Sequence, residues 1–315
     1  MRLVSYGPRG SELPGVLIDD EILPLPPVMT RIGLPPTGGI RSVLPFLGPL
    51  GEAVDAAIAR GDETVPVDRT RLGPPVPDPP NLFNCGANYF AHLMEHGLDP
   101  ALLPTLPVMF MKPISALSGP TDAIVRPREC RELDYEAELA IVIGKAGRRI
   151  PADRAADYIA GYMITNDVSA RDLGPGESQK LNQPVLFQMM RAKGWDTFQP
   201  TGPWLVTADT IHSYADIRIQ TWVNDEPRQD AYAKEMTTSP AELIEWLSAT
   251  TTLRPGDIVT TGTPAGVAAG LPSPRWLEPG DIVRMEMTGL GRMLTPIVDE
   301  TASDERSRVP VVARR

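Results

Sequence analysis

Proline limits the fold of this chain more than any other residue type. It occupies 35 of the 315 positions, about twice the usual share of ~5%. A proline donates no backbone hydrogen bond and breaks a helix interior, so long helices and central strands must avoid it. The sequence therefore predicts short strands, short helices and many loops.

Five prolines fall within the ten residues LGPPVPDPPN, which predicts an extended proline-rich linker at 73–80. Before it, β-favouring residues alternate with Gly, Pro and Asp turn signals, which predicts a small β-rich N-terminal domain at 1–72 with a short helix near 52–60. After it, residues 81–298 are expected to form a strand-rich α+β domain with antiparallel or mixed sheets, and the charged, aperiodic residues 299–315 a mobile tail. The strand-like runs of the larger domain are 133–144, 204–207, 217–223, 258–261 and 282–287, with a helical candidate at 152–159.

The charge balance and the cysteine content exclude several classes of function. Thirty basic residues against forty acidic ones give a net charge of -10, which opposes non-specific nucleic-acid binding. No uninterrupted apolar run approaches the ~20 residues of a membrane span, and the first residues lack a signal-peptide core. Cys85 and Cys130 are too few for a disulfide framework or a thiolate metal cage, so we expect free thiols. The sequence predicts a cytoplasmic protein that binds neither nucleic acid nor membrane.

Two glutamates precede an apolar run in DYEAELAIVIG, residues 134–144. Alternate residues of a strand share a face, so Glu136 and Glu138 would point the same way. The run 139–143 is apolar on both faces, which is typical of a buried strand, and buried carboxylates need a partner or a metal ion. A strand end whose glutamates face solvent fits the same residues, so both interpretations stay open here.

A second polar group lies in TNDVSARDLG, residues 165–174. Together with the two glutamates, Asp167 would complete a site of three carboxylates, which suits Mg²⁺ or Mn²⁺ better than zinc. Asn and Asp are also common in turns and helix caps, which would account for Asn166 and Asp167 without any ligand.

The choice of a general base is narrow, because the chain has three histidines. His92 and Glu95 are three residues apart and would share one face of a helix, where a carboxylate can orient an imidazole. A surface pair on a helix has the same spacing.

Two further segments could contribute to a site. Lys193 lies among apolar and aromatic residues in MMRAKGWDTFQPTGPWL, where it is either a desolvated cation that serves an oxyanion or a surface lysine whose stem covers apolar groups. The segment TTGTPAGV, residues 260–267, offers backbone N–H groups and the Thr263 hydroxyl to a carboxylate, or forms only a tight turn.

Eight segments connect these signals in order: NYFAHLMEHG, PVMFMKPISALSGP, DYEAELAIVIG, IAGYMITNDVSARD, KGWDTFQPTGPW, VNDEPRQ, LRPGDIVTTGTPAGV and LEPGDIVRMEMTGLG. In this order they resemble the fumarylacetoacetate hydrolase family from about 81 to 298. The resemblance implies a mixed β-roll catalytic domain, preceded by the small N-terminal domain that many members carry, and a homodimer. It also implies one Mg²⁺ or Mn²⁺ ion on Glu136, Glu138 and Asp167, a His–Glu pair on a mobile lid at His92 and Glu95, an active-site lysine at Lys193, and substrate-carboxylate contacts from Arg171 and Thr263.

The activity implied by the resemblance is hydrolysis of a carbon–carbon bond in a small, acylpyruvate-like 2-oxo acid, with water activated by the His–Glu pair and an enolate stabilised by the metal. Decarboxylation, isomerisation or hydration of a 2-oxo or 2-hydroxydienoate acid in aromatic catabolism would use the same site. A non-catalytic binding module on this fold is a further alternative, although a binder needs no general base. Gly174 stands where many relatives have a glutamine that helps to hold the substrate, and the stretch GPGESQKLNQPVLFQMM is longer than in compact members, so we expect a remodelled wall there.

Overall fold

The computed structural model describes residues 1–99, 107–174 and 185–301, so most of the expected tail lies outside the described residues. The helices are α1 (Leu25–Arg31), α2 (Ile40–Val43), α3 (Leu47–Arg60), α4 (Phe90–Glu95), α6 (Val185–Lys193) and α7 (Pro240–Thr250). The strands are β1 (Arg2–Tyr6), β2 (Leu13–Ile18), β3 (Glu21–Pro24), β4 (Val65–Pro66), β5 (Leu82–Gly86), β6 (Val108–Met111), β7 (Leu117–Ser118), β8 (Ile124–Arg126), β9 (Leu133–Asp134), β10 (Ala137–Ile143), β11 (Ile159–Asn166), β12 (Ser169–Ala170), β13 (Gln199–Thr207), β14 (Arg218–Val223), β15 (Glu226–Tyr232), β16 (Ile258–Thr260), β17 (Ile282–Met287) and β18 (Gly291–Asp299). The helical candidate at 152–159 is a 3-10 helix, η5 (Ala152–Tyr158).

The strands of the described residues form three sheets. The largest has eleven strands in the order β4-β3-β2-β1-β13-β11-β10-β16-β5-β6, with β7 paired to β13. A five-stranded sheet has the order β15-β14-β17-β18-β8, and β12 pairs with β9. Most neighbours are antiparallel, whereas β5–β16, β7–β13 and β8–β18 are parallel. The strand-rich α+β fold with mixed sheets that the sequence predicts is confirmed.

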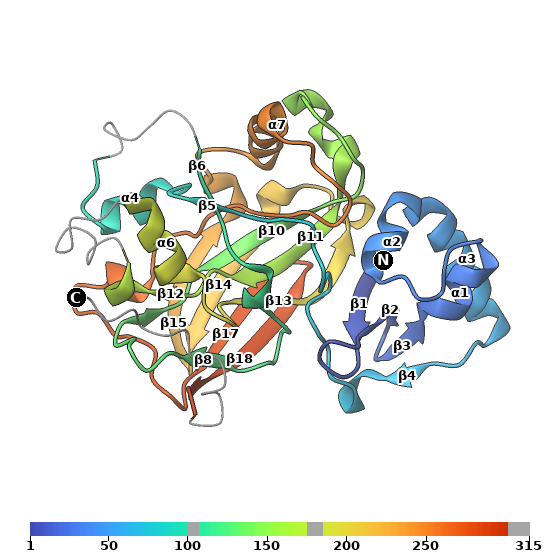
Figure 1. Ribbon diagram of the computed structural model, residues 1–315, viewed down its shortest axis with the longest axis horizontal. Helices are drawn as coiled ribbons and strands as arrows, with labels where there is room; N and C mark the ends of the chain where they lie inside the picture. The colour runs from blue at the N-terminus through green and yellow to red at the C-terminus, as the bar shows by residue number, and fades with distance from the viewer. Residues whose placement is uncertain (100–106, 175–184, 302–315) are drawn as a thin grey trace, which may run out of the picture.

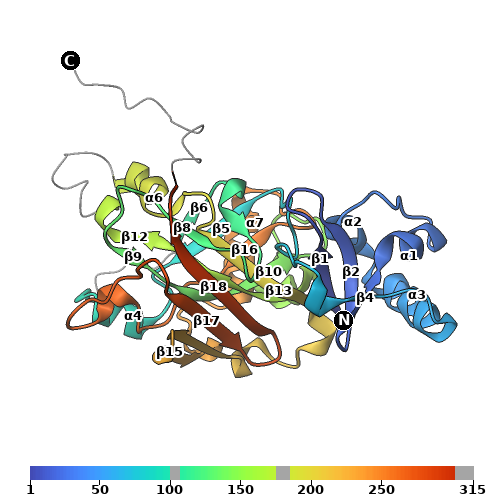
Figure 2. The same cartoon turned by 90° about the horizontal axis from the view of Figure 1, so that it is seen from below.

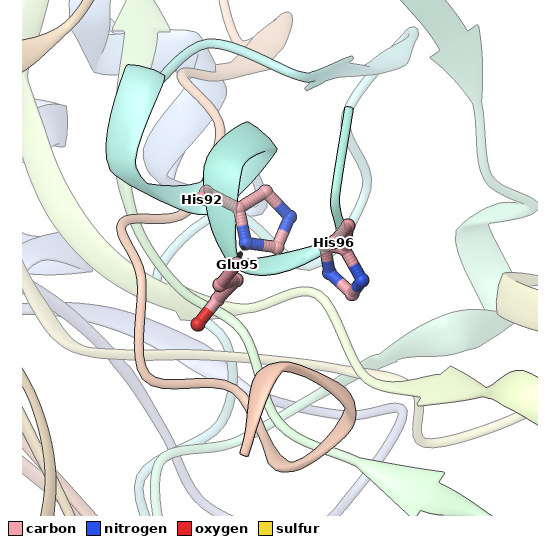
Figure 3. A group of neighbouring side chains, drawn as sticks. All are labelled: His92, Glu95 and His96. Atoms are coloured by element: carbon pink, nitrogen blue, oxygen red, sulfur yellow. Dashed lines mark hydrogen bonds and ion pairs between the residues drawn. The ribbon is translucent and has the colours of Figure 1, made fainter. Parts of the chain in front are cut away.

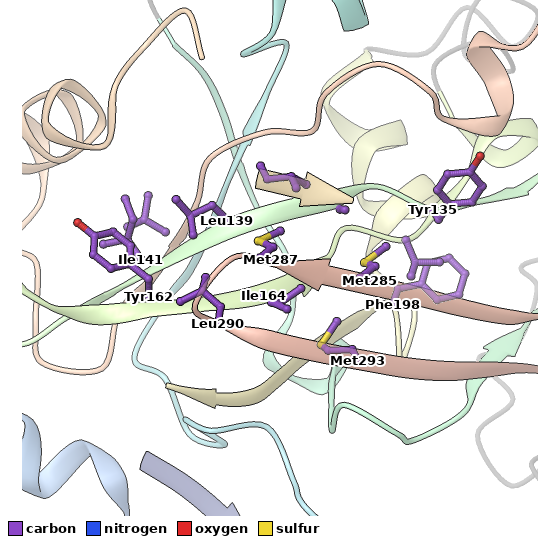
Figure 4. Close-up of a cluster of buried hydrophobic side chains, with 14 of the residues drawn as sticks. Tyr135, Leu139, Ile141, Tyr162, Ile164, Phe198, Met285, Met287, Leu290 and Met293 are labelled. Carbon is purple, nitrogen blue, oxygen red and sulfur yellow. The ribbon is translucent and has the colours of Figure 1, made fainter. Parts of the chain in front are cut away.

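Strand β10 is buried on both faces, as the sequence predicts for 139–143. Leu139 and Ile141 belong to the core between the two large sheets, together with Met285 of β17 (Figure 4). Ala140 and Val142 point the other way, into a second core that contains the N-terminal helices. Figure 2 shows β17 and β18 on one side of β10 and β13. Burial on both faces explains why this strand carries an unbroken apolar run instead of an alternating one.

Residues 1–72 contain more helix than the sequence predicts, and their strands extend the large sheet. Strand β1 pairs antiparallel with β13, so that Arg2 lies opposite Val206 and Leu3 opposite Leu205. The helices α1, α2 and α3 cover one face of this extension (Figure 1). The N-terminal part therefore shares backbone hydrogen bonds with the larger part, in addition to the covalent connection.

One segment qualifies the expectation that no stretch is suited to a membrane. The helical stretch Ile40–Arg60 is long and apolar enough to cross one by length and composition, with a mean hydropathy of 1.2. A 3-10 turn that contains Pro45 interrupts it. Leu50, Val54 and Ala57 pack into the core of the N-terminal part, which is the pattern of an amphipathic helix packed against a sheet.

Both cysteines are free, as the sequence predicts, and both are buried. Burial raises the pKa of the Cys130 thiol to about 12. A thiol of this kind stays protonated near neutral pH and is a poor nucleophile.

Candidate active site

Three carboxylates meet where β10 begins and β11 ends. Glu138 lies on β10, Glu136 just before it, and Asp167 directly after β11. Antiparallel pairing sets Ala137 opposite Asn166, and the backbone N–H of Asp167 donates to the Glu136 carbonyl over 2.9 Å. One oxygen from each carboxylate lies within 4.8 Å of the others, and all three residues are buried. The structure thus brings the three predicted ligands together and excludes a strand end that faces solvent.

Two cations hold Glu136 in its charged form. Lys193, the last residue of α6, donates to Glu136 over 2.7 Å and to Asp167 over 2.6 Å, and Arg171 donates to the other Glu136 oxygen over 2.5 Å. Burial opposes ionisation of Glu136, but Lys193 and Arg171 outweigh it and lower its pKa. In Glu138, burial and then the charges of Asp167 and Glu136 raise the pKa well above its ordinary value.

These charges test whether the predicted cation fits. Glu136, Glu138 and Asp167 are buried with one oxygen of each within 4.8 Å of the others, so their negative charges repel one another when all three are ionised. A divalent cation among the three oxygens would offset this repulsion and would favour the ionised form of Glu138. Carboxylate oxygens are hard ligands that suit Mg²⁺ or Mn²⁺. The residues present therefore fit the expected ion.

Lys112 also contacts the carboxylate cluster, and the sequence did not predict its position there. Its side chain is buried, forms an ion pair with Asp167, and donates to the carbonyl oxygens of Phe198 over 2.7 Å and Val168 over 3.3 Å. Burial lowers the pKa of Lys112 to about 8, although Asp167 acts in the opposite direction. Its position immediately after the apolar strand β6 was the only signal in the sequence. Lys112 fixes one side of Asp167, while Lys193 contacts the other.

Arg171 occupies a fixed position beside the carboxylates. Its Nε donates to Asp134 over 2.9 Å, in addition to the bond from Nη2 to Glu136. Asp134 is fully buried and also accepts backbone N–H bonds from Ala268, over 2.7 Å, and Ala269, over 3.1 Å. Two carboxylates therefore orient the guanidinium that the family resemblance assigns to the substrate, and this role of Arg171 stays a prediction.

His92 and Glu95 form a close pair on α4. Nδ1 of His92 lies 2.6 Å from one Glu95 oxygen, and the second Glu95 oxygen accepts the backbone N–H of Gly266 over 2.8 Å. Figure 3 shows the other ring nitrogen of His92 on the side away from Glu95, near the ring of His96. The ring centres of the two histidines are 4.7 Å apart. Because the carboxylate favours a proton on Nδ1, Nε2 of His92 is left as the acceptor.

The backbone N–H groups of segment 260–267 bind carboxylates, as the sequence allows, and these carboxylates belong to the protein itself. Gly262 donates to Glu138 over 2.9 Å and Gly266 donates to Glu95. The Thr263 hydroxyl donates to the Ala137 carbonyl over 3.0 Å and accepts from a side-chain amide. This segment therefore ties the His–Glu pair to the carboxylate cluster, and the role of Thr263 toward a substrate stays a prediction.

A cavity of about 440 Å³ connects these groups. The predicted site residues along its wall are His92, Glu136, Glu138, Arg171, Lys193 and Thr263. The rest of the wall is mainly apolar. A carboxylate cluster that fits a divalent cation and a buried His–Glu pair, both beside one cavity, are together typical of a metal-dependent enzyme.

Comparison with known proteins identifies the family. The chain belongs to the fumarylacetoacetate hydrolase family, because the model of its C-terminal domain, described as fumarylacetoacetate (FAA) hydrolase C-terminal, matches residues 81–298. The members of this family are divalent-metal-dependent enzymes, and the three carboxylates described above fit such an ion.

Three relatives show the range of the family. Maleylpyruvate hydrolase from Sphingobium sp. SYK-6, solved with a manganese(II) ion and pyruvate, is 32% identical with a TM-score of 0.76, over 96% of this chain and 100% of that one. The 2-hydroxyhepta-2,4-diene-1,7-dioate isomerase from Mycobacterium marinum is 36% identical with a TM-score of 0.62, over 76% of this chain and 82% of that one. The mitochondrial oxaloacetate tautomerase of Xenopus laevis is 38% identical over 71% of this chain and 67% of its own length.

Proposed function

We propose that this protein is a metal-dependent hydrolase that cleaves a carbon–carbon bond in an acylpyruvate-like 2-oxo acid. The observation that carries the proposal is the 2.6 Å contact between His92 and Glu95, because His92 lines the same cavity as Glu136 and Glu138. Hydrolysis needs a base that activates water. A protein that only binds a 2-oxo acid transfers no proton, so it would not need a buried imidazole whose tautomer is fixed by a carboxylate.

In the proposed reaction, Arg171 and Thr263 orient the substrate carboxylate. Nε2 of His92 accepts a proton from water, and the water oxygen attacks the acyl carbonyl carbon. Lys193 stabilises the oxyanion that forms there. The bond between this carbon and the methylene group then breaks, and the methylene carbon takes up a proton. The products are a carboxylic acid and pyruvate. A Mg²⁺ or Mn²⁺ ion at the three carboxylates would supply Lewis-acid stabilisation of negative charge on the 2-oxo acid.

Isomerisation of a 2-oxo or 2-hydroxydienoate acid is the second candidate, because the chain is similar to an isomerase and a tautomerase as well as to a hydrolase. Isomerisation moves a proton but adds no water, and decarboxylation requires chiefly an electron sink. The rates of the three reactions should therefore depend on His92 to different extents.

The proposal is tested by His92→Ala, assayed with acetylpyruvate for hydrolysis and with oxaloacetate for decarboxylation. General-base assistance is worth about 10² to 10⁴ in rate, so hydrolysis should fall by that order while any decarboxylation falls much less. His212, which is exposed and lies outside the cavity wall, gives the matched control His212→Ala. An equal loss of both activities, or a native enzyme that acts on neither substrate, would overturn the hydrolase assignment. Formation of an isomer without cleavage would establish the second candidate.

A further inference from the structure

The described wall of the cavity carries polar and apolar side chains. Its polar part includes Glu136, Glu138, Arg171 and Lys193, and a 2-oxo acid head would bind there. Its apolar part includes Cys85, Leu93, Leu98, Val108, Phe110 and Met189. We propose that the acyl group of the substrate is apolar and that Phe110, Val108 and Met189 select it. This inference rests on the proposed function, which places the 2-oxo acid head at the carboxylates.

Phe110 lies where the apolar part of the wall meets the polar part. Its ring centre lies 5.5 Å from the Lys193 ammonium, and that ammonium contacts Glu136. Val108 lies two residues earlier on β6, so both side chains share one face of the strand. Gly86 on β5 lies opposite Val108, and a methyl group added there would be 3.8 Å from Val108 and 3.9 Å from Phe110. Gly86 therefore leaves the space in front of both apolar side chains open.

Helix α6 and helix α4 provide the facing wall. Met189 reaches the cavity from α6, and Leu93 from α4. A methyl group at Gly174 would lie 3.3 Å from the Ala192 methyl group, which is closer than ordinary contact. The glycine thus allows α6 to pack tightly against the segment after Arg171, and this packing holds Met189 at the cavity.

The charges of the described wall argue against a second carboxylate on the substrate. Its lysine and arginine side chains, Lys193 and Arg171, both contact Glu136. Of its two histidines, His92 pairs with Glu95, and burial, followed by the charges of His92 and Arg171, lowers the pKa of His96. A carboxylate that entered between Val108 and Met189 would lose water without gaining a counter-charge from the described residues. An alkyl group would gain by leaving water.

Binding of oxamate derivatives tests this selectivity without requiring turnover. Oxamate presents a 2-oxo acid head. N-butyl oxamate adds an apolar tail, and N-(3-carboxypropyl) oxamate adds a tail of similar length that ends in a carboxylate. Titration calorimetry with Mg²⁺-saturated protein should show N-butyl oxamate binding at least tenfold tighter than oxamate, since each buried methylene is worth about fourfold. The carboxylated derivative should bind no tighter than oxamate.

A charge introduced on the wall provides the converse test. Val108 is 41% exposed, so Val108→Arg should fold, and Val108→Met is its matched apolar control. The Arg variant should bind N-(3-carboxypropyl) oxamate at least fivefold tighter than the native protein does, and the Met variant should not. The inference is overturned if N-butyl oxamate binds no tighter than oxamate, if the carboxylated derivative is the tightest ligand of the native protein, or if Val108→Arg leaves the preference unchanged. If oxamate did not bind in a Mg²⁺-dependent manner, the proposed function would be refuted, and so would this inference.

Discussion

Replacement of Glu95 by glutamine should remove most of the activity, although the two side chains have nearly the same size. Both Glu95 oxygens accept hydrogen bonds, one from His92 over 2.6 Å and one from the Gly266 N–H over 2.8 Å. A glutamine amide has one oxygen and one donor nitrogen, so it can preserve only one of these bonds. If its oxygen stays on Gly266, its NH₂ group faces Nδ1 of His92 and moves the imidazole proton to Nε2. The proton then occupies the nitrogen that must accept one from water.

The expected loss is the value of the general base, a factor of about 10² to 10⁴ in kcat, which corresponds to ~3 to 5 kcal/mol of transition-state stabilisation. The assay is the decrease in ultraviolet absorbance of acetylpyruvate under saturating substrate. Met94 is 62% exposed on the same helix, so Met94→Gln adds the same amide without touching His92 and should keep near-native activity. Mn²⁺ affinity should be unchanged in both variants, because neither residue belongs to the carboxylate cluster. If Glu95→Gln kept more than half of the native kcat, the pair would not be the source of the base.

Four further predictions test other parts of the structure. Glu136→Ala should abolish Mn²⁺ binding in calorimetry and leave the circular dichroism spectrum native, and full activity of the unmodified enzyme in EDTA would contradict a metal site. Gly270→Ala places a methyl group 2.1 Å from the Glu95 carboxylate, so kcat should fall at least tenfold at unchanged Mn²⁺ affinity; native kcat would show that Glu95 can move freely. Lys112→Met breaks a buried ion pair and should lower the free energy of unfolding in urea and EDTA by about 3 kcal/mol, whereas Lys234→Met, at an exposed lysine, should change it by less than about 0.5 kcal/mol. We also propose a homodimer, for which light scattering should give about twice the chain mass of 34.2 kDa; a monomer at micromolar concentration would refute it.

The spacing of residues in the sequence was sufficient to predict how side chains that are close together in the chain lie relative to one another. The i,i+3 spacing of His92 and Glu95 predicted a pair on one helix face, and the structure has them in contact. The apolar run 139–143 favoured a buried strand, and the alternation of side chains put Glu136 and Glu138 on one face, although a solvent-facing strand end stayed open until the structure showed both residues buried. The later strand-like runs were also placed well, since 282–287 coincides with β17. In each case the direction of a side chain follows from the backbone periodicity alone.

Contacts between distant segments were not predictable in this way. Lys112 reaches Asp167 because β5 and β6 continue the same sheet as β10 and β11, and the sequence carries no signal of that strand order. The sequence predicted that the turn at 260–267 offers backbone N–H groups to a carboxylate, but not to which one. Gly262 and Gly266 donate to Glu138 and Glu95 of the chain itself, and the sequence does not show this because every residue except proline has a backbone N–H. The pairing of β1 with β13 was also missed, because the sequence carries no signal of strand order.

That last pairing determines how the chain should respond to limited proteolysis. A cut within the proline-rich connector would sever the covalent link, but β1 would still be hydrogen-bonded to β13, and Leu3 would still be buried in a core that also contains Leu205. The two fragments should therefore remain associated and should separate only in denaturant. Expression of residues 81–298 alone would leave this side of β13 without its partner strand and would expose an apolar surface. Unpaired strands of this kind promote aggregation. Residues 1–72 should therefore be required to keep this edge of the large sheet paired and its apolar surface buried.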